Sequence, residues 1–214
     1  MSGFLFIEPK VVKSNLVAGD DLNGLPDPAD PCFSVASGQP VVFLQNPAPN
    51  AGPNTAVCGQ TIVLPGITSA FSGVWTQQSG PATATIATPN AAGSSVSVPV
   101  FGVYSFAWTE TNGICVRTDS VQITFNETPA VNALTAACNP TNTQYTVTFD
   151  VLGGSAPYTV NGLGGTFSGN TFSSAPLTDN NPYSFVLVDV NGCQTATISG
   201  NQDCFCVTNA GTMI

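Results

Sequence analysis

Two segments of the chain repeat the same order of residue types. The first runs from Tyr104 to Cys115 (YSFAWTETNGIC) and the second from Tyr183 to Cys193 (YSFVLVDVNGC). Each begins with large apolar residues at alternate positions and continues with an acidic residue, an Asn-Gly pair and a cysteine. Asn-Gly readily adopts the positive φ values of a type I′ turn, so each segment predicts a β-hairpin. The repeat therefore predicts two similar β modules, with cysteines 78 residues apart.

Alternation of apolar and polar residues continues elsewhere in the chain. It is clearest in residues 144–151, and it recurs in residues 95–100 and 121–125. A period of two residues is typical of strands with one buried face, and no window has the 3.6-residue period of a capped helix. The sequence predicts an all-β fold, which we expect to be two tandem immunoglobulin-like β-sandwich modules in an extended arrangement.

The composition excludes several classes of function. Of 214 residues, three are Lys or Arg, twelve are Asp or Glu and none is His, which gives a net charge of -9. Without histidine the chain has no Ser-His-Asp or Cys-His relay and no imidazole metal ligand. Three basic residues cannot neutralise a phosphate backbone, so nucleic acid is not an expected partner. No apolar run reaches the roughly 18 residues that a membrane-spanning helix requires.

Stretches rich in Pro, Gly and Asn suggest the domain boundaries. Residues 46–54 and 126–129 have the composition of linkers, and Pro129 in the second would limit flexing. We predict four segments: a leading segment at 1–49, modules at 50–127 and 128–203, and the start of a further module at 204–214.

Seven cysteines in an acidic chain rich in Thr, Ser and Asn indicate disulfides and an extracellular location. The simplest pairing gives one bridge to each module, Cys58–Cys115 and Cys138–Cys193. For the Cys204-x-Cys206 pair we expect two separate disulfides, one reaching back to Cys32 and the other reaching forward. The odd count suggests a partner in a longer protein.

Several short motifs resemble known repeat families. Residues 50–53 (NAGP), 57–59 (VCG), 75–81 (WTQQSGP) and 102–113 (GVYSFAWTETNG) resemble the PKD-like, immunoglobulin-like repeats of giant Bacteroidetes surface proteins. Residues 153–158 (GGSAPY) and 189–193 (DVNGC) are similar to the SprB-type repeat of gliding-motility adhesins. The resemblance implies β-sandwich modules, export by the type IX secretion route and work as an adhesin or spacer at the cell surface.

The densest group of acidic residues lies in residues 19–30, where four of the twelve acids fall. It resembles the end of a thrombospondin type 3 calcium repeat, in which oxygen ligands wrap a hard cation around a glycine turn. Gly19 stands where that repeat has an Asp, which removes one ligand, and a solvated loop is the alternative. No cofactor is required, and Ca²⁺ is possible. The candidate ligands are Asp21, Asn23, Asp27 and Asp30.

Trp75 and Trp108 allow two interpretations. Aromatic faces can stack on sugar rings, but Trp75 lies 17 residues after Cys58, and immunoglobulin-like domains often bury a tryptophan against their disulfide. Trp108 continues the apolar face of its strand, so we predict that both tryptophans belong to the core.

Three acidic residues flank the two hairpins: Glu110, Asp119 and Asp189. Paired carboxylates could hydrolyse a glycoside if they lay roughly 5–9.5 Å apart, but a carboxylate before Asn-Gly more often accepts hydrogen bonds from the turn. We therefore predict no enzymatic activity. Residues 119–121 match an Asp-Ser/Thr-apolar O-glycosylation site of Bacteroidetes, with Ser120 as acceptor, and residues 126–128 form an N-glycosylation sequon.

The favoured hypothesis is a non-enzymatic fragment of a long exported adhesin, which supplies stalk or adhesive repeat modules. Its partners would be polysaccharides or proteins at the cell surface or outside the cell, and neighbouring modules. One alternative is a filament subunit that donates an apolar segment, such as residues 4–12 or 41–44, to a neighbour's sheet edge. Another is a carbohydrate-binding module of an exported enzyme, with Trp75 or Trp108 as the sugar platform.

Overall fold

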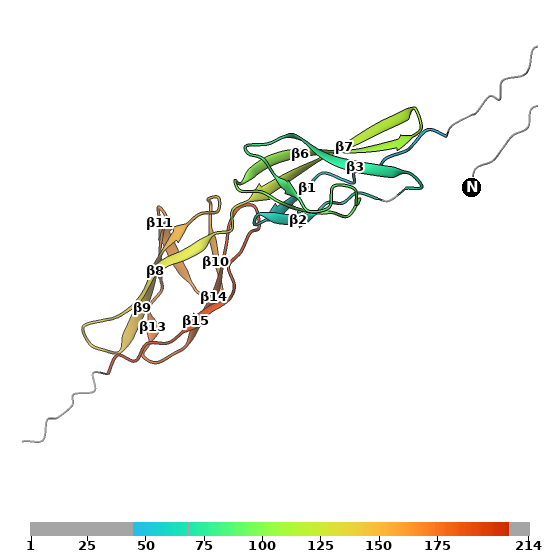
Figure 1. The fold of residues 1–214 in the computed structure, drawn as a ribbon. Coiled ribbons are helices and arrows are strands. Elements are labelled where there is room, and N and C mark those ends of the chain that lie inside the picture. Colours follow the sequence, from blue (N-terminus) through green and yellow to red (C-terminus); the bar gives the residue numbers. More distant parts are fainter. Residues whose placement is uncertain (1–44, 68, 206–214) are drawn as a thin grey trace, which may run out of the picture. The chain divides into compact units, whose positions relative to one another are not determined.

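The computed structural model describes residues 45–67 and 69–205. Every regular element in these ranges is a β-strand, so the predicted all-β class is confirmed (Figure 1). We call strands β1–β7 the first module and strands β8–β15 the second module. Each module has its own cluster of buried side chains.

The first module is an immunoglobulin-like sandwich of a four-stranded and a three-stranded sheet. In the larger sheet β1 runs parallel to β7, and the other pairs are antiparallel. The larger sheet has the order β1(Thr55–Cys58), β7(Cys115–Asn126), β6(Gly102–Asn112), β3(Ser72–Ser79), and the smaller has the order β2(Thr61–Val63), β5(Ser95–Ser97), β4(Thr85–Ile86).

The core of the first module is built from the predicted alternation on β6. Tyr104, Phe106 and Trp108 are each at most 2% exposed and face the smaller sheet, from which Val96 packs against them. The Tyr104 hydroxyl donates a 2.8 Å hydrogen bond to the carbonyl of Val100. This contact is the tyrosine corner of immunoglobulin-like domains, and it ties the start of β6 to the preceding loop.

The second module is a sandwich of a five-stranded and a three-stranded sheet. In the larger sheet β8, β12 and β13 pair with β9, and β11 pairs with β12. The first sheet contains β8(Ala130–Cys138), β9(Gln144–Leu152), β11(Gly165–Ser168), β12(Thr171–Ser174) and β13(Leu177–Thr178), and the second contains β10(Thr159–Asn161), β14(Tyr183–Val188) and β15(Ile198–Gly200).

Aromatic side chains fill the second core. On β9, Tyr145, Val147 and Phe149 point inward at alternate positions, as the sequence pattern predicts. The Phe149 ring stacks on Phe172 of its own sheet and on Phe185 of the facing sheet, with ring centroids 5.0 Å apart in both pairs. These contacts join the two layers of the sandwich.

Tyr145 makes the second module sensitive to alkaline pH. Burial raises the pKa of its hydroxyl above the usual 10.0; Tyr183 and Asp179 add to the shift, and a backbone hydrogen bond with Gln202 opposes it. The hydroxyl donates to the carbonyl of Asn181. An unfolded Tyr145 ionises at lower pH than a folded one, so stability is present below pH 10 and is lost as pH rises through the raised pKa. With free thiols alkylated beforehand, the urea midpoint of the second module should fall above about pH 10, and Tyr145→Phe should weaken this fall. An unchanged pH profile in Tyr145→Phe would contradict the assignment.

The two predicted hairpins form, between β6 and β7 and between β14 and β15, but the first turn differs from the expected type. In the first, Asn112 pairs with Cys115, so Gly113 and Ile114 are the central residues. Only Gly113 of these two has a positive φ, 61°. A positive φ at the first central residue alone is the pattern of a type II′ turn rather than type I′. Sequence reasoning placed the turn one residue too early.

Candidate functional site at the module junction

The junction between the modules contains a disulfide that crosses it. Cys58 is the last residue of β1 and lies opposite Asn126, the last residue of β7, where the chain leaves the first module. Its sulfur is bonded to that of Cys193, in the turn after β14, and the two Cα atoms are 5.5 Å apart. The bond closes a sequence separation of 135 residues. The modules are therefore joined covalently twice, by the peptide chain and by this disulfide.

Asp189 organises the turn that carries Cys193. One carboxylate oxygen accepts hydrogen bonds from the backbone N–H groups of Asn191 (2.9 Å) and Cys193 (2.8 Å). The other oxygen accepts from the N–H of Ser155 at 3.0 Å, and the residue is only 5% exposed. The prediction that this acidic residue serves the Asn-Gly turn is confirmed. Hydrogen bonds to a carboxylate are stronger than neutral ones, so the turn is held in one conformation.

Changing Asp189 to Asn should destabilise the second module. The amide keeps one accepting oxygen but points an NH₂ group at backbone donors, so at least one buried N–H loses its partner. Bonds to charged groups are worth roughly 1.5–3 kcal/mol, and we expect a loss of that size in urea unfolding. Asp150→Asn is the matched control, because within the described residues the Asp150 side chain accepts a single hydrogen bond, from the Thr171 hydroxyl at the surface. Equal stability of the two variants would contradict the role given to Asp189.

Two glycines allow the linker to pack against the second module. Gly153 and Gly154 both have φ of 65°. A Cβ on Gly153 would lie 2.8 Å from the carboxyl group of Glu127, and one on Gly154 would lie 2.9 Å from Cβ of Pro129. Larger residues would therefore be strained and crowded at both positions. The Gly-Gly motif thus serves the connection between the modules.

The disulfide pairing predicted from the sequence is wrong. The structure pairs Cys58 with Cys193 and Cys138 with Cys204, and Cys115 is in neither bond. Cys115 begins β7 while Cys58 lies beside its end, which separates them by 11 residues of strand, or about 36 Å. A bond between them is impossible in this fold.

The second predicted bridge fails for a similar reason. Cys138 lies opposite Tyr145, whose ring neighbours Tyr183 at the beginning of β14. Cys193 follows the other end of β14, so the length of that strand separates the two cysteines. Cys204 is bonded to Cys138 instead of reaching Cys32, and Cys32 and Cys206 lie outside the described residues.

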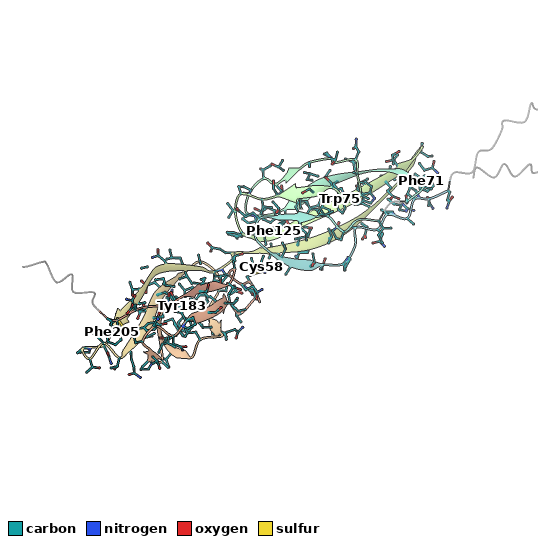
Figure 2. The ribbon with its side chains drawn as sticks, turned by 90° about the horizontal axis from the view of Figure 1, so that it is seen from below. Cys58, Phe71, Trp75, Phe125, Tyr183 and Phe205 are labelled. Carbon is teal, nitrogen blue, oxygen red and sulfur yellow. A yellow bond between two sulfur atoms is a disulfide. The ribbon has the colours of Figure 1, made fainter. Side chains whose placement is uncertain are left out.

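Both tryptophans belong to the core, as predicted. Each is 2% exposed, and their ring centroids are 5.2 Å apart. The indole N–H of Trp75 donates to the carbonyl of Ala92 at 2.9 Å. Figure 2 shows Trp75 and Phe125 within the first module and Tyr183 within the second. Neither tryptophan can be the exposed sugar platform that the carbohydrate-binding alternative requires.

The remaining candidate acids have separate surroundings. Glu110 is fully buried; one carboxylate oxygen accepts from the Trp108 indole N–H at 2.9 Å, and the other has no partner among the described residues. Asp119 accepts from the backbone N–H of Ala51 at 2.8 Å. Within residues 45–67 and 69–205, no three His, Cys, Asp or Glu side chains gather as metal ligands would.

Two other predicted sites, for glycosylation and for calcium, stay predictions. Ser120 is exposed on β7, opposite Ala107, and its glycosylation stays a prediction. The calcium candidates Asp21, Asn23, Asp27 and Asp30 lie outside the described residues. A search of the described part of the chain finds no helix long and apolar enough to cross a membrane.

Comparison with known proteins adds similarities of fold. No protein-family model matches the chain, and no curated sequence does. An eight-domain immunoglobulin fragment of Down Syndrome Cell Adhesion Molecule matches 72% of this chain at 12% identity and a TM-score of 0.48, and the match spans 27% of that fragment. The I67–I69 fragment of titin matches 75% of this chain and 64% of its own length, at 12% identity and a TM-score of 0.37.

A further solved structure, the PKD domain from KIAA 1837 protein, matches 44% of this chain at 21% identity, with 92% of that domain covered and a TM-score of 0.33. The assignment to immunoglobulin-like sandwiches rests on the strand order itself. The two disulfides indicate that the protein folds in an oxidising compartment outside the cytosol.

Proposed function

We propose that the chain supplies non-enzymatic stalk or adhesive repeat modules to a long exported cell-surface adhesin. The observation that carries this proposal is the disulfide between Cys58 and Cys193. A bond from one module to the next does not build a pocket or align reactive groups. It keeps successive modules attached to each other, which is the requirement of a protein that transmits force between a cell and a surface.

The outer face of the β3–β6–β7 sheet is suited to weak contacts with neutral polymers. The strand register places Val74, Thr109 and Thr118 in one row, and Thr76 and Ser120 on either side of the buried Ala107 in the next. Alternation turns the charged side chains of Glu110, Arg117 and Asp119 to the opposite face. We propose extracellular polysaccharides or surface proteins as partners, bound weakly by each module and strongly by many modules together.

The resemblance to PKD-like and SprB-type repeats supports a finer version of this proposal. In that version the protein is a gliding-type adhesin of Bacteroidetes that is exported by the type IX route, and Ca²⁺ bound in residues 19–30 would stiffen the leading segment. The Gly-Gly and Asp-x-Asn-Gly-Cys motifs on which the resemblance depends both lie at the junction described above.

A bead-binding assay tests the proposed adhesion. Beads that carry many copies of the 214-residue protein should adhere to a panel of surface polysaccharides and proteins under flow, while the monomer binds weakly. Thr109→Lys with Thr118→Lys should abolish adhesion, whereas Thr85→Lys on the other sheet should not. Absence of bead adhesion, or release of sugars from the panel, would contradict the proposal.

The second candidate function is a filament subunit that works by strand donation. It is favoured by the position of β3 at the edge of its sheet. The candidate donor segments, residues 4–12 and 41–44, lie outside the residues that the structure describes. Deletion of residues 1–16 should prevent filament assembly if this second function is correct, and unaffected assembly would exclude donation by residues 4–12.

A further inference from the structure

The second module contains a small cavity beside the end strands of its two sheets. β10 is the end strand of the three-stranded sheet, β11 is the end strand of the five-stranded sheet, and residues 162–164 connect them. The cavity has a volume of about 270 Å³. All of its lining residues belong to the second module, so it is separate from the outer face of the β3–β6–β7 sheet. The lining includes Tyr158, Leu163, Gly164, Gly165, Phe167 and Phe172.

Three aromatic rings line this cavity. The Phe167 ring lies between the other two, with its centroid 5.2 Å from that of the buried Phe172 and 6.1 Å from that of Tyr158. Tyr158 and Phe167 are half-buried, so each packs against the core and also presents part of its ring to the cavity. The Tyr158 hydroxyl donates a 2.9 Å hydrogen bond to the carbonyl of Gly153, which holds this ring in place before any ligand arrives.

The polar groups around the cavity are neutral. Tyr158 is the one titratable residue in the lining, and its hydroxyl already has an acceptor. The exposed Thr159 and Thr166 also belong to the lining. As end strands, β10 and β11 each have one edge whose backbone N–H and C=O groups have no neighbouring strand among the described residues. The cavity therefore combines aromatic ring faces with uncharged hydrogen-bonding groups.

Size and charge together select the class of ligand. The volume is just below the roughly 300–1,000 Å³ of sites for drug-sized molecules, so the cavity fits a single ring rather than a helix or a folded surface. Aromatic faces pack against the C–H groups of a sugar ring, and neutral donors and acceptors bind its hydroxyls. The net charge of -9 opposes an anionic ligand, and no acidic side chain lines the cavity to attract a cation.

We propose that this cavity binds one unit of a neutral polysaccharide, with the sugar ring packed against Tyr158 and Phe167. The inference rests on the proposed function, in which extracellular polysaccharides are among the partners, and it adds a binding site on the second module. One sugar unit in one cavity binds weakly, and many copies of the module along the same polysaccharide bind strongly together.

Saturation-transfer NMR on the 214-residue protein tests this assignment. The probes are neutral hexasaccharides of glucose, mannose and xylose, together with an anionic oligogalacturonate. We expect transfer to at least one neutral probe and none to the anionic probe. Gly164→Leu should weaken sugar binding by about tenfold or more, because the new side chain occupies the cavity. A Cβ at this position meets no atom within 4 Å, so the fold should tolerate the change.

Gly93→Leu is the matched control for Gly164→Leu. A Cβ on Gly93 also has room, with a methyl carbon of Val63 at 4.0 Å as its neighbour, and Gly93 lies in the first module. This variant should bind the sugars as the wild type does. Phe167→Ala, which removes one aromatic face, should lose binding as Gly164→Leu does, and circular dichroism checks that each variant is folded.

Several outcomes would overturn the assignment. Equal sugar binding by the wild type and a folded Gly164→Leu variant would place the sugar elsewhere on the protein. Transfer to no neutral probe, or equal transfer to the anionic probe, would contradict the ligand class. Transfer to a proline-rich decapeptide but to none of the sugars would assign the cavity to a protein partner instead.

The bead assay separates this inference from the proposed function. If beads adhere through Thr109 and Thr118 while no sugar binds at the cavity, the inference is wrong and the proposed function stands. If a neutral sugar binds at the cavity while the beads do not adhere, the cavity assignment stands and the proposed function is wrong.

Discussion

Replacing Cys58 and Cys193 together with serine should lengthen the chain that a pulling force can extend between residues 45 and 205. With the disulfide present, the shortest covalent path contains 14 residues up to Cys58 and 13 from Cys193 onward. Without it, the path runs from residue 45 to Cys138, crosses to Cys204 and contains 96 residues. The difference of 69 residues corresponds to about 240 Å of extended chain.

Single-molecule force spectroscopy measures this length directly. In the wild-type protein the force runs only through residues 45–58 and 193–205, whereas in the double variant it passes through the whole first module and unfolds it. Cys138→Ser with Cys204→Ser is the matched control, because the Cys58–Cys193 path does not use that bond. Equal extension of the wild type and the Cys58/Cys193 variant would show that the bond is not formed or not loaded.

The second large effect is expected from Trp75→Ala. Trp75 is 2% exposed, packs against Trp108 with their rings tilted by 44°, and donates its indole N–H to the carbonyl of Ala92. It also fills the space over Gly66, where a Cβ would lie 2.6 Å from the ring. Removing a buried tryptophan leaves a cavity and a lost hydrogen bond, for which we expect about 3–5 kcal/mol less stability in the first module.

Urea unfolding followed by tryptophan fluorescence is suited to this measurement. The chain has two tryptophans, both in the first module, so Trp108 still reports on that module in the variant. Ile114→Ala is the control, because Ile114 is 91% exposed at the hairpin turn and its removal should leave the midpoint unchanged. Equal urea midpoints for Trp75→Ala and Ile114→Ala would contradict the assignment of Trp75 to the core.

Local patterns in the sequence predict the strands, the core faces and the turn-capping acid. Alternation identified β6, β9 and the inward position of Trp108, since a period of two residues directly determines which face a side chain occupies. The carboxylate of Asp189 was predictable because it lies within hydrogen-bonding range of its own turn.

The disulfide junction could not be predicted in this way. The sequence-based prediction paired each cysteine with the next one in its module, which requires the two side chains to lie close together. For Cys58 and Cys115 this depends on which end of β7 lies beside β1. That register is a long-range property that spacing does not encode.

The parallel pairing of β1 with the end of β7 has a consequence for the order of events during export. A chain that emerges from its N-terminus exposes Cys58 and then Cys115 long before residue 193. If the first module folds as it emerges, the strand length of β7 separates these two thiols and prevents their premature oxidation together. Cys58 then stays unpaired beside the last residue of β7 until the second module emerges with Cys193. The fold of the first module therefore favours the Cys58–Cys193 bond over a bond between Cys58 and Cys115.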